Sequence, residues 1–112
     1  MFKASVGASS KADPKGAVTE VVDKMRHADE DLSSSKVVFA FSSCSYSPKD
    51  MLDEFAAELP GIPVIGNTSH TGIITDEGFI CGEGFLGAMA IYDDDLAVGV
   101  ASVAKSEASQ DA

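Results

Sequence analysis

Two segments of the sequence carry apolar residues at the spacing of a buried helix face. In both segments these residues follow the order i, i+1, i+4, i+5 and i+8, which is one stripe of a helix with 3.6 residues per turn. Asp13-Pro14 and Ser47-Pro48 precede the stripes, and a capping residue followed by proline favours a helix start. Pro60-Gly61 ends the second helix. The stripes are Ala17, Val18, Val21, Val22 and Met25, and Met51, Leu52, Phe55, Ala56 and Leu59.

Apolar runs around these helices indicate strands. Residues 37–41 form a continuous β-branched and aromatic run, which is typical of a central strand covered on both faces. Residues 2–8 precede the first helix, and residues 63–65 follow the second. The order strand, helix, strand, helix, strand predicts parallel strands joined by right-handed crossovers.

From Gly72 onward the pattern changes to short strands separated by glycines and acidic residues, which predicts an antiparallel meander. The expected fold is therefore α/β, with a parallel β-α-β-α-β unit extended by the meander into a mixed sheet. In the last strand Ala97, Gly99 and Ala101 leave a face of small residues against which a second chain could pack. The predicted short strands are residues 73–75, 79–81, 85–92 and 96–103.

Length and composition limit the classes of protein. A chain of 112 residues has room for one core, so we expect a single domain over residues 1–104 and a disordered polar tail over residues 105–112. No apolar run approaches the roughly 20 residues of a membrane span, and the N-terminus shows no secretory signal. We therefore expect a cytoplasmic protein. Because so small a chain buries little surface, we also expect a homodimer.

The charge balance is strongly acidic. Eighteen acidic residues against eight basic ones give a formal net charge of −10, which repels phosphate backbones and anionic headgroups. Neither a nucleic acid nor a membrane is expected as a partner. Two cysteines, Cys44 and Cys81, are too few for a disulfide scaffold, so reduced thiols are expected.

The loops after the three predicted parallel strands consist of small, hydroxyl-bearing or polar residues. Because ligands of open α/β sheets bind beyond the carboxyl ends of the strands, we expect these loops to form a site at one edge, beside two helix N-termini. Such a site suits a small polar ligand, for instance a carboxylate. The alternative is that these residues only form turns and caps. The candidate ligand-binding residues are Ser9, Ser10, Ser43, Cys44, Gly66, Asn67, Thr68, Ser69, His70 and Gly72.

A few residues suggest functions other than the binding of a small polar ligand. Cys44 precedes a helix and His70 lies in another of these loops, so a thiol-dependent enzyme that uses both residues is an alternative. Haem binding through either side chain is another, because imidazole and thiolate are common axial ligands. A purely structural interaction module is a third. Asp93-Asp94-Asp95 lacks further oxygen ligands, so no metal is predicted. We assign no catalytic residue and no cofactor.

Several segments together resemble the N-terminal part of the FIST sensory domain. Ile65-Gly66 is the most telling of them, and the resemblance runs in order from about Val6 to Ala101. It implies a non-enzymatic input module of signal transduction that binds a small molecule, with amino acids as proposed ligands, haem in some members and a signalling output protein as partner. The segments are Val6-Gly7-Ala8-Ser9-Ser10, Asp13-Pro14, residues 37–43, Leu59-Pro60-Gly61, residues 63–69 and Thr71-Gly72.

Overall fold

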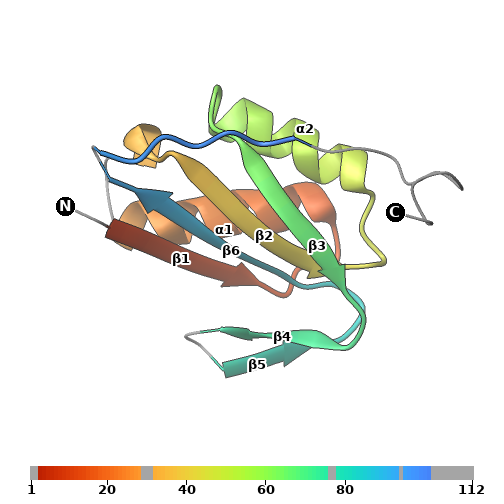
Figure 1. The fold of residues 1–112 in the computed structure, drawn as a ribbon. Helices are drawn as coiled ribbons and strands as arrows, with labels where there is room; N and C mark the ends of the chain where they lie inside the picture. The colour runs from red at the N-terminus through yellow and green to blue at the C-terminus, as the bar shows by residue number, and fades with distance from the viewer. Residues whose placement is uncertain (1–2, 29–31, 76–77, 94, 102–112) are drawn as a thin grey trace, which may run out of the picture.

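Two helices cover one face of a four-stranded sheet in the computed structural model, which describes residues 3–28, 32–75, 78–93 and 95–101 (Figure 1). Helix α1 spans Pro14–Ala28 and α2 spans Pro48–Glu58, with a short 3-10 turn, η1, at Leu32–Ser34. The predicted caps are confirmed. Asp13 Oδ2 accepts a hydrogen bond from the Gly16 amide at 2.6 Å, and Ser47 Oγ accepts one from the Asp50 amide at 3.4 Å.

The sheet confirms the predicted α/β class with a mixed sheet. Its strands are β1 (Lys3–Ser9), β2 (Val37–Ser43), β3 (Val64–Ser69) and β6 (Leu86–Tyr92), in the order β1-β6-β2-β3. The β2–β3 pair is parallel, and β6 pairs antiparallel with both β1 and β2. The three strands of the predicted β-α-β-α-β unit therefore run in one direction.

The antiparallel part differs in detail from the expected meander. Strand β6 lies between β1 and β2, where both of its backbone edges find partners. Strands β4 (Gly72–Thr75) and β5 (Gly78–Cys81) pair only with each other, as a separate hairpin. Residues 95–101 form no strand, so that part of the predicted strand 96–103 is wrong. Residues 102–103 and the predicted tail lie outside the described residues.

The core lies between the helices and the sheet. The whole predicted stripe of α1 is buried, and the helix approaches the sheet closely at Gly7, where a Cβ atom would lie 2.6 Å from the Val21 carbonyl oxygen. In α2 the prediction is partly wrong, because Leu52 and Ala56 are exposed. This helix lies over the β3 edge of the sheet, so only its Met51, Phe55 and Leu59 side reaches the core.

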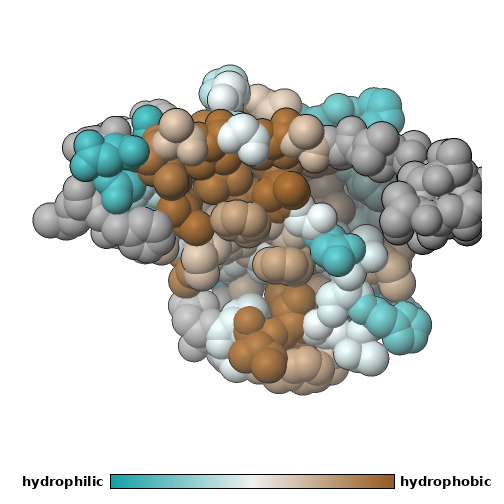
Figure 2. Space-filling view, in the orientation of Figure 1, coloured by the Kyte–Doolittle hydropathy of each residue, from teal (hydrophilic) through white to brown (hydrophobic). Residues whose placement is uncertain are grey.

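The opposite face of the sheet has no helix over it. Phe39, Phe41, Ile65 and Met89 lie on this face and are between 38% and 47% exposed, so the prediction that residues 37–41 are covered on both faces is wrong. We call these four residues with Val6 the open face. Figure 2 shows apolar side chains gathered over the sheet and over the hairpin. Within the described residues, no helix has the length and apolarity needed to cross a membrane.

Candidate functional site

The three predicted bends leave the sheet along the same edge. Ser9 at the end of β1 pairs with Leu86 of β6, and Leu86 also pairs with Ser42 of β2. Beside it, Ser43 pairs with Ser69 at the end of β3. The register therefore brings together the carboxyl ends of the strands that the sequence analysis named.

The hydroxyl groups at this edge bond mostly to nearby backbone. Ser9 Oγ accepts from the Lys11 amide at 3.2 Å. Ser43 Oγ donates to the Glu83 carbonyl at 3.2 Å and accepts from the Ser45 amide at 3.2 Å. Ser69 Oγ donates to the Gly72 carbonyl. The local contacts of Ser9, Ser43 and Ser69 are those of turns and caps, whereas the bond from Ser43 to Glu83 joins two segments that are distant in the sequence. These three hydroxyls therefore stabilise the bends.

Tyr46 fills the space between the first two bends. Its ring is 4% exposed, and its hydroxyl donates to the Lys11 carbonyl. Burial raises the pKa of Tyr46 to about 12, and the negative charges of Asp13 and Glu20 add to the effect. Gly84 packs on the same point, because a Cβ atom there would lie 2.5 Å from the Lys11 carbonyl oxygen. The sheet edge is therefore well packed at these two bends.

The other predicted residues of the bends lie at the surface. Ser10, Cys44 and His70 are exposed, and Gly72 begins β4. Both cysteines are free thiols, and in the described part of the chain no hydrogen bond joins Cys44 to His70. No cluster of three or more His, Cys, Asp or Glu residues able to hold a metal ion occurs among the residues that the structure describes.

A groove of about 410 Å³ lies between α2 and β3, and residues 100–101 form part of its wall. It contains three of the predicted site residues, but these belong to strand β3 itself and not to the loop after it. We call it the α2–β3 groove. Its lining residues are Ala40, Ser42, Pro48, Met51, Leu52, Phe55, Val64, Ile65, Gly66, Asn67, Thr68, Val100 and Ala101.

Polar groups gather on the sheet side of the α2–β3 groove. Ser42 is 4% exposed, and it forms part of the groove wall. Thr68 and Asn67 are exposed next to it on the neighbouring strand. Asn67 pairs with Phe41, so its side chain projects from the other face of the sheet, where its Oδ1 accepts from the Thr68 amide at 3.0 Å. The groove thus offers the hydroxyls of Ser42 and Thr68.

Backbone groups add to this polar side. Gly66 lies so close to β2 that a Cβ atom would be 1.7 Å from the Ala40 carbonyl oxygen. Strand β3 is an edge strand, and its outer backbone groups have no strand partner in the described residues. An edge strand offers N–H donors and C=O acceptors to whatever binds beside it.

The helix side of the α2–β3 groove is apolar. Met51 and Phe55 are buried, and Leu52 and Val100 are exposed. No charged side chain lines the groove. A cavity with a polar side and an apolar side suits a small molecule that itself has both.

A second cavity, of about 250 Å³, lies between the open face and strand β4. Ile73 reaches from β4 over Gly87, where a Cβ atom would lie 2.7 Å from Ile73 Cδ1. Apart from Thr75, its lining side chains are apolar, and none is charged. We call it the hairpin cavity.

Sequence reasoning missed several residues of both cavities. It assigned Leu52 to the core and placed Ser42 in the loop after the second strand without naming it as a ligand-binding residue. Ser42 does carry a signal, because it follows Val38 and Ala40 at alternate positions of β2 and so faces the helices. The exposure of Leu52 and Val100 depends on how α2 and residues 95–101 pack, which no local pattern contains.

Comparison with known proteins identifies a family. The family model described as FIST N domain matches residues 36–112. No curated protein sequence matches the chain. Among solved structures, an FtsZ-like protein of unknown function from Nostoc punctiforme is similar, with 12% sequence identity over 84% of this chain and 94% of that chain, and a TM-score of 0.37. A likeness at that TM-score supports no argument about fold or function.

Proposed function

Because this chain belongs to the FIST N domain family, we propose that it is a sensory domain that binds a small polar molecule, such as an amino acid, in the α2–β3 groove. The FIST domain is a sensory and signal-transduction domain, and the family is not an enzyme family. The observation that carries the proposal is a groove of ligand size with the hydroxyl-bearing residues Ser42 and Thr68 on its sheet side and apolar residues on its helix side.

The polar side of the groove supports this ligand class. The Ser42 hydroxyl can donate and accept at the groove wall, and a hydrogen bond from it to a ligand contributes about 0.5–1.5 kcal/mol. The exposed Thr68 hydroxyl lies opposite Ser42 on the adjacent strand. The free edge of β3 adds backbone donors and acceptors, which can bind the carboxylate and ammonium groups of an amino acid.

Size and charge agree with a small ligand. The groove volume of about 410 Å³ lies in the ordinary range for small-molecule pockets, roughly 300–1,000 Å³. Pro48 places the first turn of α2 at the groove, and the positive end of a helix favours a carboxylate. The apolar side, with Met51, Leu52 and Phe55, suits an aliphatic or aromatic side chain of the ligand.

The same groove suggests a route to a signalling partner. Val100 and Ala101 form part of its wall, although residues 95–101 belong to no helix or strand. A ligand in the groove contacts this segment and restrains it. An output protein that binds the segment would then sense occupancy.

Thermal melting with a panel of amino acids tests the proposal. A ligand at a hundredfold its dissociation constant adds about 2.7 kcal/mol to the free energy of unfolding. We expect a shift with amino acids that carry apolar side chains and a smaller one with acidic amino acids, because the chain carries a net charge of −10.

Two serine variants locate the site. Ser42→Ala removes this hydroxyl from the groove wall and should weaken binding about tenfold with little loss of stability. Ser10→Ala, a matched change in an exposed bend, should leave affinity unchanged. The proposal fails if no amino acid shifts the melting temperature. It also fails if both variants bind like the wild type, and a loss of affinity in Ser10→Ala alone would move the site to the bends.

A further inference from the structure

The open face and the β4–β5 hairpin form one exposed apolar surface. On the sheet, Val6, Met89, Phe39 and Ile65 are successive partners across all four strands. On the hairpin, Ile74 is 89% exposed, yet it lines the hairpin cavity together with Phe39, Phe41 and Met89. The sheet and hairpin parts therefore meet at that cavity, as Figure 2 shows from the open side.

The exposed area has the size of one side of a protein interface. Six large side chains contribute most of it, and at about 200 Å² for a fully exposed side chain of this size their exposed fractions amount to about 600 Å². The largest apolar patch of an ordinary monomer is itself about 300–600 Å² and often functional, and a standard interface buries about 800 Å² per partner. The six residues are Phe39, Phe41, Ile65, Ile74, Phe79 and Met89.

The surface has both a projecting and a hollow part. Ile74 and Phe79 are cross-strand partners, and Phe79 is 62% exposed. Beside them lies the hairpin cavity of about 250 Å³, which is large enough for an apolar side chain of this size. In a two-fold symmetric pair each chain presents the same patch, so the projecting part of one chain meets the hollow of the other in both directions.

The distribution of charge indicates which kind of partner can bind this apolar surface. The chain has a net charge of −10, but none of the six residues and none that line the hairpin cavity is charged. Contacts between two copies that involve these residues alone therefore place no like charges together.

We propose that the open face and the β4–β5 hairpin form the interface of a symmetric homodimer, in which the hairpin of each chain covers the hairpin cavity of the other. The interface differs from the small-residue face of residues 97–101 that the sequence suggests. It does not depend on the α2–β3 groove, because the two sites share only Ile65.

Analytical ultracentrifugation of the chain tests the homodimer. We expect a monomer–dimer equilibrium in the range of about 1–100 µM, and no larger species. Association should tighten between about 0.05 and 1 M salt, because screening reduces the repulsion between two acidic chains. Binding of a basic protein to the same surface would instead weaken as the salt concentration rises, because screening reduces the attraction between opposite charges.

A matched pair of lysine variants locates the interface. Ile74→Lys places a charge on a side chain that is 89% exposed, so the fold is retained, and association should weaken at least tenfold. Ala57→Lys makes the same change of net charge on the exposed surface of α2 and should associate as tightly as the wild type or more tightly. Circular dichroism checks that both variants keep their secondary structure.

The outcomes separate this inference from the proposed ligand site. A wild-type chain that stays monomeric throughout this range, or equal association of the two lysine variants, overturns the homodimer. Association that continues beyond the dimer overturns the symmetric arrangement. Melting shifts with amino acids should be the same in Ile74→Lys and the wild type, so loss of the dimer and loss of ligand binding are measured independently.

Discussion

Both faces of the central sheet carry apolar side chains, but those on one face are buried and those on the other are exposed. On β2, Val38 faces the helices and is fully buried, whereas its neighbour Phe39 faces the open side and is 38% exposed. On β6, Ala88 and Ala90 are buried under the helices, and Met89 between them is exposed. Apolar residues occupy both faces, but α1 and α2 cover only one (Figure 1).

This contrast shows that composition alone does not determine burial. A continuous apolar run is the pattern of a strand covered on both faces, but it does not say whether the cover comes from the same chain. The helix-covered face supplies the stability of the monomer. The open face keeps apolar surface available for association, which is where the proposed dimer contact lies.

The largest expected effect compares a phenylalanine on each side of the sheet. Phe55→Ala removes a side chain that is 2% exposed in the helix-covered core and should lower the free energy of unfolding by about 3–5 kcal/mol. Phe41→Ala removes one that is about half exposed, and its loss should be less than half as large, because less area leaves water on folding. Urea unfolding of dilute monomer measures both.

Protein concentration sharpens this comparison. Where the chain is dimeric, the cost of Phe41→Ala should grow, whereas that of Phe55→Ala should not, because only Phe41 lies on the proposed interface. Equal losses for the two variants in dilute monomer would contradict the distinction between a covered and an open face.

Local signals predicted the elements that local chemistry determines. The α1 stripe, the caps Asp13 and Ser47 and the run at residues 37–41 all depend on neighbours within a few positions, and the helices and strand formed there. The position of β6 between β1 and β2 could not be predicted in this way. A strand with this pattern of apolar residues fits either an interior or an edge position of a sheet. Its position depends on pairing with strands that are distant in the sequence.

The candidate site was predictable only in part. The bends meet at one edge because parallel strands end together, but hydroxyls such as Ser43 Oγ bond to backbone that comes from far along the chain, at Glu83. Asn67 and Thr68 were predicted as loop residues because the apolar run stops at Ile65 and is followed by Gly66 and Asn67, two residue types that are depleted in strands. They lie in β3 because pairing with Phe41 and Ser42 extends that strand.

The next effect concerns Tyr46, which closes the helix-covered core at the sheet edge. Tyr46→Phe removes the hydrogen bond to the Lys11 carbonyl and should cost about 1 kcal/mol near neutral pH. Burial holds the folded pKa at about 12, above the usual tyrosine value of 10.0. The stability linked to keeping this buried hydroxyl neutral is therefore complete below pH 10, and it is lost as the pH rises from 10 to 12.

Urea unfolding at several alkaline pH values measures that loss. The free energy of unfolding of the wild type should fall more steeply between pH 10 and 12 than that of Tyr46→Phe, whose profile reports all other groups. Parallel profiles would show that the Tyr46 hydroxyl is not buried, and that the covered side is open at its edge.

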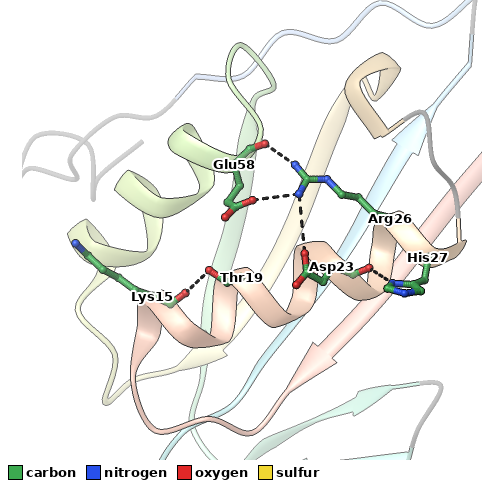
Figure 3. Close-up of polar contacts among 6 residues, drawn as sticks. All are labelled: Lys15, Thr19, Asp23, Arg26, His27 and Glu58. Carbon is green, nitrogen blue, oxygen red and sulfur yellow. Dashed lines mark hydrogen bonds and ion pairs between the residues drawn. The ribbon is translucent and has the colours of Figure 1, made fainter.

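The smallest expected effect concerns the ion pairs of the helix layer. Arg26 of α1 reaches the end of α2, where its guanidinium donates to Glu58 Oε2 at 3.2 Å and to the Glu58 carbonyl at 2.9 Å (Figure 3). Arg26→Met should lower stability by about 0.5–1 kcal/mol, because the pair is only partly exposed and joins two helices.

The Lys49–Asp53 pair is the control, because it lies within α2 and is fully solvated. Its hydrogen bond holds the pKa of Asp53 below the usual value. Lys49→Met should raise that pKa in an NMR titration while leaving the unfolding curve unchanged, since water screens both charges. If Lys49→Met destabilised the chain as much as Arg26→Met, the contact between helices would have no special role, and burial of apolar surface alone would hold the helix layer on the sheet.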